Sequence, residues 1–284
     1  MKEERAFGRR KGTKEEMESR RIMRPIIVVV IFLWSCAHPT DASSQTQDPH
    51  EAQPERPTVA THAGTVERGW LEIEAGGELD YYDDHSNGVG LPLTIKLGLG
   101  SHVQFGIYAS AVRPPNRHAV EVGDLALGVK LRLTDDFPIL GRFALLPSIK
   151  LPTGSTATDA GTGTNDVSLL LISSHDLGPI ALDINVGVTH RSGDGTQAPQ
   201  NATLWTVSFG GPAIGVLGWV AELYGLPGTS GPAGKSPLVA TLFGPTFVIQ
   251  SSIVLDMGVI VSVSQPRTFA LYFGGVWNIG RVWE

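Results

Sequence analysis

From Trp70 onward, apolar and polar residues alternate in stretches of about ten residues, and turn-forming residues separate these stretches. In residues 125–133, for example, Val129 and Leu131 alternate with Lys130 and Arg132. Successive side chains of a β-strand point to opposite faces, so a period of two predicts strands with one apolar and one polar face. The pattern predicts twelve strands, at 70–81, 91–99, 103–109, 125–133, 142–151, 166–174, 180–190, 202–210, 216–224, 237–249, 252–264 and 268–279.

The connections between these strands alternate in length. Long connections such as 82–90 and 152–165 are followed by short ones such as 100–102 and 175–179, and only residues 265–267 break the order. Outer-membrane barrels have such long outer loops and tight periplasmic turns. Aromatic residues near strand ends resemble the interfacial girdles of these barrels: Trp70, Tyr81, Phe143, Trp205, Phe209, Trp219, Phe247, Phe269 and Trp277. The sequence therefore predicts an all-β fold, a 12-stranded antiparallel transmembrane β-barrel over residues 69–284, with both termini in the periplasm.

Residues 1–42 have the organisation of an export signal. A basic stretch precedes the apolar run 26–34, which is too short to span a bilayer because spanning needs about 20 apolar residues. Met17 or Met23 is an alternative start of the chain. Cys36 follows the apolar run at a position that approximates the lipoprotein cleavage site, so it is a candidate for lipidation. The alternative is that Cys36 is removed with the signal.

Residues 43–68 differ from both neighbouring regions. They are polar, contain Pro49, Pro54 and Pro57, and have no apolar periodicity. This composition predicts a flexible periplasmic lead segment.

The charged positions of the strands indicate which face points inward. A charge that faces lipid at mid-depth costs about 2–4 kcal/mol, so charged side chains are expected to face the lumen. Replacing Val129 by Arg is therefore expected to cost that much, and neutralising Lys130 much less. Basic and acidic strands are expected to face each other across the lumen, either orienting a solute or bracing a closed interior with ion pairs. The expected lumen-lining residues are Glu72, Glu74, Glu78, Lys96, Lys130, Arg132, Arg142, Lys150, Asp183, Asn185, Glu222 and Asp256.

Composition narrows the function further. The net charge is −6, which argues against binding of nucleic acid, and the single cysteine excludes a disulfide framework. The eight histidines have no metal-ligand spacing. Ser174, His175 and Asp176 are consecutive strand residues, so their side chains cannot converge as a catalytic triad. Gly161 and Gly163 lack the context of a phosphate-binding loop. No enzyme, cofactor or metal site is expected.

A group of turn motifs carries a family resemblance. Residues 151–154 (Leu-Pro-Thr-Gly) end one strand, 161–163 (Gly-Thr-Gly) lie in the next loop, and Asn165 and Asp166 open the following strand. Residues 175–178 (His-Asp-Leu-Gly) then lead to 182–187. In this stretch the chain resembles the Gram-negative outer-membrane transporter-like family that is named for the meta-cleavage pathway of phenol degradation. The resemblance implies an outer-membrane barrel that passes small hydrophobic or aromatic molecules, and it brings no catalytic residues.

Three functional hypotheses follow from these patterns. The first is a passive outer-membrane channel or transporter for a small, hydrophobic or aromatic solute. The second is a non-conducting structural or surface-interaction barrel with a salt-bridged, closed lumen, and the third is a secreted β-sandwich. The expected partners are outer-membrane lipid, a small-molecule solute and the barrel-assembly machinery. Such barrels usually end on an aromatic residue, whereas here Trp283 is followed by Glu284.

Overall fold

The computed structural model describes residues 48–192, 199–226, 237–265 and 267–284. The export signal expected in residues 1–42, the candidate lipidation site Cys36 and residues 43–47 of the expected lead segment lie outside the described residues. Within the described part of the chain, no helix has the length and apolar character needed to cross a membrane.

The described residues form thirteen strands. Twelve of them have 10 to 14 residues, and β4 has only 2. The strands are β1 (Trp70–Tyr82), β2 (Asn87–Gly100), β3 (Val103–Arg113), β4 (Glu121–Val122), β5 (Leu125–Phe137), β6 (Gly141–Leu151), β7 (Asp166–Leu177), β8 (Ile180–Arg191), β9 (Asn201–Ile214), β10 (Leu217–Leu226), β11 (Leu238–Gln250), β12 (Ile253–Ser262) and β13 (Thr268–Arg281).

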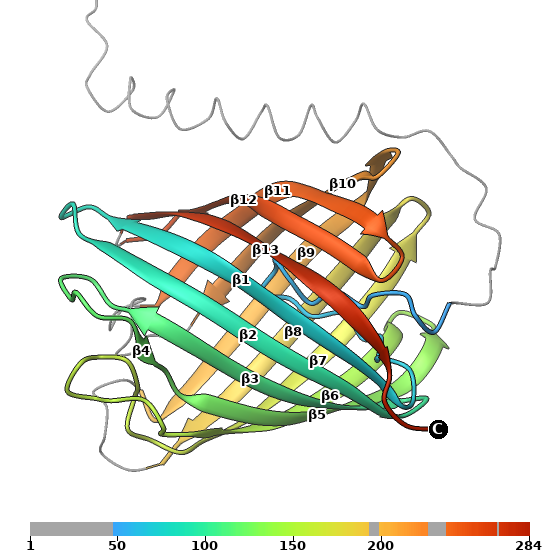
Figure 1. The fold of residues 1–284 in the computed structure, drawn as a ribbon, viewed down its shortest axis with the longest axis horizontal. Helices are drawn as coiled ribbons and strands as arrows, with labels where there is room; N and C mark the ends of the chain where they lie inside the picture. The colour runs from blue at the N-terminus through green and yellow to red at the C-terminus, as the bar shows by residue number, and fades with distance from the viewer. Residues whose placement is uncertain (1–47, 193–198, 227–236, 266) are drawn as a thin grey trace, which may run out of the picture. The chain divides into compact units, whose positions relative to one another are not determined.

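The twelve long strands form a closed antiparallel barrel (Figure 1). Each pairs with its neighbour in the chain, β1 pairs with β13, and β2 pairs with both β1 and β3, so no long strand has a free edge. Closure matters because backbone groups in lipid have no water to pair with, and a closed sheet pairs them all within itself. The predicted 12-stranded antiparallel barrel is confirmed. Strand β4 was not predicted, and it pairs with Ala111 and Val112 of β3.

The two ends of the barrel differ. Short turns, such as residues 178–179 between β7 and β8, lie at the end where β1 begins and β13 ends, which we call the turn end. Residues 83–86, 114–120 and 152–165 lie at the opposite end, which we call the loop end. The first long connection is shorter than the expected 82–90 because β1 and β2 continue further towards each other.

The two faces of the wall have opposite chemistry along most strands. On β8, Val186 and Val188 point outward and are about half exposed, whereas Asn185 points inward and is fully buried. On β5, Lys130 is likewise fully buried inside the barrel. An exposed apolar exterior around a buried polar interior is the inverse of a water-soluble protein, and it is the arrangement that a bilayer requires.

Candidate functional site in the barrel lumen

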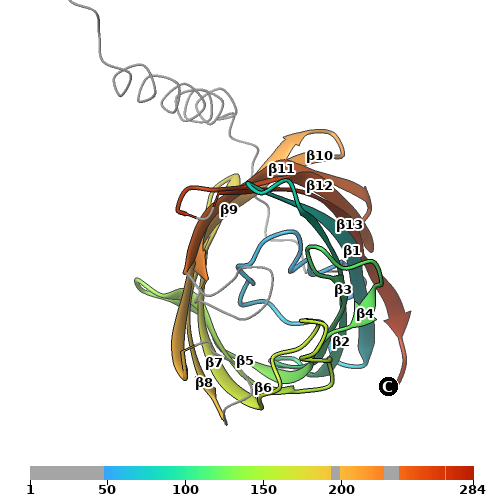
Figure 2. The same cartoon turned by 90° about the vertical axis from the view of Figure 1, so that its left-hand side faces the viewer.

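Residues 48–68, which we call the lumenal segment, run inside the barrel (Figure 2). Ala60, Ala63 and Val66 of this segment are at most 2% exposed. The polar, proline-containing composition predicted a flexible periplasmic lead here, and the structure differs from that expectation. The physical reason is that polar side chains of the wall supply the contacts that the segment's own sequence lacks.

The backbone of the lumenal segment is bound by side chains of the wall. Such an extended chain has no neighbouring strand, so its buried N–H groups need other acceptors. Glu74 accepts the N–H groups of Glu55 and Arg56 at 2.9 and 3.0 Å, and Glu222 accepts those of Val59 and Ala60 at 2.8 and 2.6 Å. Four further wall residues accept one N–H each: Glu72 from Gln53, Asn185 from Thr61, Ser174 from Ala63 and Gln104 from Val66.

Two fully buried lysines complete this clamp. Lys96 on β2 lies 2.5 Å from a carboxylate oxygen of each of Glu72 and Glu74, and its ammonium also donates to the carbonyl oxygen of Gln53. A buried carboxylate needs ion pairs or hydrogen bonds to replace its contacts with water. Lys96 therefore offsets one of the two negative charges of Glu72 and Glu74 where β1 binds the lumenal segment.

Lys130 on β5 binds the lumenal segment directly. Its ammonium forms an ion pair with Glu55 and donates hydrogen bonds to the hydroxyl of Thr61 at 3.2 Å and to the carbonyl oxygens of His62 and Gly64 at 2.9 and 3.1 Å. Sequence reasoning expected ion pairs between acidic and basic strands across the lumen. Among the described residues, the pairs instead lie within one strand, join adjacent strands or neighbouring loops, or join the wall to the lumenal segment.

Glycines of the wall make room for the lumenal segment. Gly76 and Gly274 face each other on β1 and β13, and the guanidinium of Arg56 lies over both, 3.1 Å from Asp256. On β2, a Cβ atom at Gly98 would overlap the carbonyl oxygens of Val66 and Glu67. Glycine inside a strand often marks such a close approach of another backbone.

The remaining expected lumen residues lie nearer the ends of the barrel. Arg132 and Arg142 lie towards the turn end, where they pair with Asp135 at 3.1 Å and with Asp176 at 3.5 Å. Asp183 accepts a hydrogen bond from Ser174 at 2.5 Å. None of these three residues contacts the lumenal segment through a hydrogen bond or an ion pair among the described residues.

Lys150, at the loop end, belongs to a separate polar cluster. It pairs with Asp124 at 2.8 Å and with Asp166 at 3.4 Å. Asp124 also accepts the N–H groups of Gly154 and Thr162 at 3.0 and 2.9 Å, so it holds both ends of the 152–165 loop. Burial opposes ionisation of Asp124, but the hydrogen bonds from Lys150 and from these amides outweigh it and lower the pKa of this carboxyl. Sequence reasoning missed Asp124 because it lies between strands.

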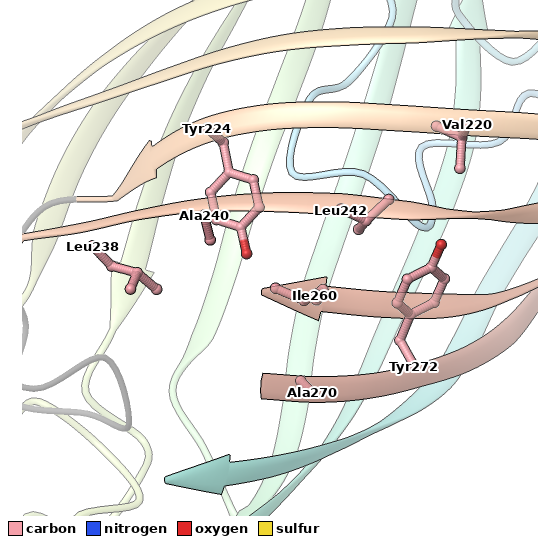
Figure 3. Packing of buried hydrophobic residues seen from close by; sticks show 8 residues of the cluster. All are labelled: Val220, Tyr224, Leu238, Ala240, Leu242, Ile260, Ala270 and Tyr272. Atoms are coloured by element: carbon pink, nitrogen blue, oxygen red, sulfur yellow. The ribbon is translucent and has the colours of Figure 1, made fainter. Parts of the chain in front are cut away.

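One side of the lumen is apolar, which sequence reasoning did not predict. Inward-facing residues of β10–β13 form a buried cluster that packs against Val59 of the lumenal segment (Figure 3). Its members are Val220, Tyr224, Leu238, Ala240, Leu242, Ile260, Ala270 and Tyr272, and we call it the apolar wall. The sequence contains a sign of this apolar side, because strands 217–226 and 238–250 are mostly apolar at both alternating sets of positions.

A cavity of about 320 Å³ opens at the loop end beside the apolar wall. Glu78 and Asp80 of β1 line one side of it, and Leu238, Ile260 and Ala270 line another. We call this cavity the vestibule. Of the expected lumen-lining residues, Glu78 alone lines it.

The consecutive Ser174, His175 and Asp176 do not form a catalytic site. Ser174 points inward to the lumenal segment, whereas His175 lies 2.9 Å from the hydroxyl of Ser173. Ser173 donates its own hydrogen to the carbonyl oxygen of Leu140 at 2.8 Å, so this hydroxyl is not poised as a nucleophile.

No protein-family model matches this sequence, and no curated protein sequence matches it. Solved structures of outer-membrane barrels are similar in fold. An outer-membrane channel from Pseudomonas putida F1 is 14% identical with a TM-score of 0.55, and the alignment covers 80% of this chain and 99% of that one. The KdgM porin, solved with disordered oligogalacturonate, is 11% identical with a TM-score of 0.44 and coverages of 73% and 99%. The NalP translocator domain from Neisseria meningitidis is 11% identical with a TM-score of 0.47 and coverages of 74% and 89%.

At these identities the likeness concerns the fold alone. The chain has the fold of outer-membrane β-barrels, among which are channels and porins, and this fold points to the outer membrane.

Proposed function

We propose that this protein is a passive, non-enzymatic outer-membrane channel for small hydrophobic or aromatic solutes, which pass along the apolar wall. The observation that carries the proposal is the presence of eight buried, mostly apolar residues on the inner face of a barrel. A pore for ions or sugars gains nothing from such a surface, whereas an apolar solute gains about 25 cal/mol for each Å² of apolar area removed from water.

The polar side of the lumen argues against a wide aqueous pore. Lys96, Lys130 and Glu72 are fully buried in contacts with the wall and the lumenal segment, so little space for water remains around them. Moving hydrated ions past these groups would require the segment to leave. The proposed route therefore runs beside Val59 of the segment, along the strands β11–β13. The turn motifs that resemble the phenol-degradation family agree with such solutes.

The second candidate is the non-conducting barrel, and the same buried network favours it. If the segment and the apolar wall pack without any transient opening, the protein is a structural or surface-interaction barrel that contacts its partners through its outer loops. For both candidates, we propose that the barrel is surrounded by outer-membrane lipid and is folded by the barrel-assembly machinery.

Uptake of an apolar aromatic dye separates the two candidates. Intact Gram-negative cells that lack their major porins would express the protein, and the fluorescence of N-phenylnaphthylamine would report passage across the outer membrane. We expect faster uptake than in cells without the protein. Ala270→Trp should abolish the gain by filling the space beside the apolar wall, since Ala270 is buried and faces inward.

Ala75→Trp is the matched control, because Ala75 on β1 is exposed on the lipid-facing side. If cells with the unaltered protein take up the dye no faster than cells without it, the channel is refuted and the structural barrel is the better hypothesis. The unaltered protein and both variants must show the shift in gel mobility on heating that marks a folded barrel.

A further inference from the structure

We propose that the vestibule binds amphipathic cations, which are small molecules with an ammonium group on an apolar body, and thereby selects them from other apolar solutes. The transport part of this inference rests on the proposed function. The binding site is argued from the geometry of the vestibule alone. The vestibule combines a carboxyl pair and an apolar surface within one cavity of about 320 Å³. That volume is within the range of small-molecule sites.

The carboxyl pair is open to a ligand. Glu78 and Asp80 are two residues apart on β1, so both point into the lumen. Their partners on β2 are Gly90 and Gly88, which have no side chains to cover them. On β13, Asp80 faces the small Ala270 and Glu78 faces Tyr272. Among the described residues, no ion pair includes Glu78 or Asp80, unlike Glu72 and Glu74 on the same strand.

The nearest positive group that the structure describes towards the centre of the barrel is already paired. Arg56 lies over Gly76, two residues from Glu78, and its guanidinium contacts Asp256 at 3.1 Å and the carbonyl oxygen of Phe273 at 3.2 Å. The carboxyl pair is therefore left without this guanidinium as a direct partner. A solute that carries its own ammonium group can supply the missing charge.

The apolar part of the ligand has a defined place. Ala270 and Ile260 are cross-strand partners on β13 and β12, and Leu238 follows on β11. Strands lie about 4.8 Å apart, so an ammonium at β1 and an apolar body over β12 are separated by about 10 Å. The ring of Tyr224 also lines the vestibule, and an aromatic face of this kind attracts cations as well as apolar groups. Arylalkylamines have these dimensions.

Binding to the purified full-length chain in nanodiscs tests the inference. The probes are 3-phenylpropylamine, its neutral counterpart 3-phenylpropanol and the anion 3-phenylpropanoate, titrated by calorimetry. We expect the amine to bind at least about tenfold more tightly than the alcohol, because a hydrogen bond between charged groups contributes more binding free energy than one made by a neutral hydroxyl. The double variant Glu78→Gln/Asp80→Asn should bring the amine-to-alcohol ratio to about one.

The matched control is Asp83→Asn/Asp84→Asn, which removes the same charge from exposed positions in the adjacent turn. This variant should keep the ratio of the unaltered protein. If the carboxyl variant fails to fold, Ala270→Phe provides a second test, because filling the cavity should weaken the amine at least tenfold. Equal binding of amine and alcohol, or a ratio that Glu78→Gln/Asp80→Asn leaves unchanged, would overturn the vestibule site.

Uptake of the same probes, radiolabelled, into intact cells distinguishes this failure from failure of the channel. Selective binding of the amine without uptake of either probe would retain the vestibule site and reject the channel. Uptake of both probes at equal rates, without selective binding, would retain the channel and reject the vestibule site.

Discussion

The contacts of Lys130 make it the residue on which the position of the lumenal segment depends most directly. From sequence alone, neutralising Lys130 was expected to be mild, but the structure changes that expectation. Lys130→Met keeps the length and much of the volume of the side chain and removes its charge. It would leave Glu55 without its ion pair and the carbonyl oxygens of His62 and Gly64 without their donor.

The free-energy cost of Lys130→Met follows from the burial of its ion pair with Glu55. The side chains of Lys130 and Glu55 are 0% and 10% exposed. Removing one partner of a buried ion pair costs about 3–5 kcal/mol. The strand ladder does not depend on this pair, so the cost should fall on the docking of the segment. At about 1.4 kcal/mol for each factor of ten, the undocked population should rise about 140-fold to 4,000-fold.

Thiol labelling measures this population. Ala63 is fully buried against the wall, so a cysteine at this position reacts with a water-soluble maleimide only when the segment leaves. Cys36, the single native cysteine, is replaced by serine in every variant. Lys130→Met should accelerate labelling of Ala63→Cys by the factor above, up to the rate of a free thiol.

Arg132→Met is the control on the same strand. Arg132 also points inward, but it bonds to Asp135 and to the carbonyl oxygen of Ser101, not to the lumenal segment. Labelling of Ala63→Cys should change little in this variant. If Lys130→Met labels no faster than Arg132→Met while both barrels are folded, Lys130 does not hold the segment and the reasoning is wrong.

Three further predictions concern other parts of the barrel. Gly98→Ala should accelerate the same labelling, because its Cβ would overlap the carbonyl oxygens of Val66 and Glu67, whereas Gly100→Ala, with 3.9 Å of space, should not. Val129→Arg should destabilise the barrel by about 2–4 kcal/mol in a urea titration in lipid if it lies near mid-bilayer, and equal loss in Val129→Leu would mean that the faces are misassigned. The lowered pKa of Asp124 means that its contribution to loop stability is present above the ordinary value of about 4 and is lost as pH falls through the lowered value. Pepsin should therefore cut residues 152–165 faster as pH falls. The Asp124→Asn variant should already be cut faster at the highest pH at which pepsin is active. The Asp159→Asn variant, which changes an exposed carboxyl of the same loop, should be cut at the rate of the unaltered protein at that pH.

The barrel itself could be predicted from the sequence because lipid imposes a strict pattern. Lipid-facing positions must be mostly apolar and without charge, so a period of two appears along most of the twelve strands and is visible without a structure. Strand β4 escaped prediction because two residues, Glu121 and Val122, are too few to show any period. The alternation of long and short connections could be read because turn residues cluster between strands.

The lumen could be predicted only in part, since its contacts join residues that are distant in sequence. Glu222 binds the backbone of Ala60 across 162 positions, and Asn185 binds that of Thr61 across 124. No local pattern in a polar, proline-containing segment indicates such partners. The apolar wall was missed for a different reason. In the sequence, charged residues are what indicates the inward face, and most inward positions of β10–β13 carry no charge.

The division of the lumen into a polar and an apolar side follows from what an extended chain needs. Eight strands leave an interior that side chains can fill, and sixteen leave an aqueous channel, so a twelve-stranded barrel encloses space that something else must occupy. An extended segment brings unpaired N–H groups into that space, and each of them needs an acceptor. Acceptors such as Glu74 and Asn185 project from the polar side, so most of the segment binds there, and it meets the apolar wall at Val59. Among the described residues, the acceptors beside the apolar wall at the loop end, Glu78 and Asp80, bind no N–H group of the segment, so an apolar solute can enter this part of the lumen without displacing one of the segment's hydrogen bonds.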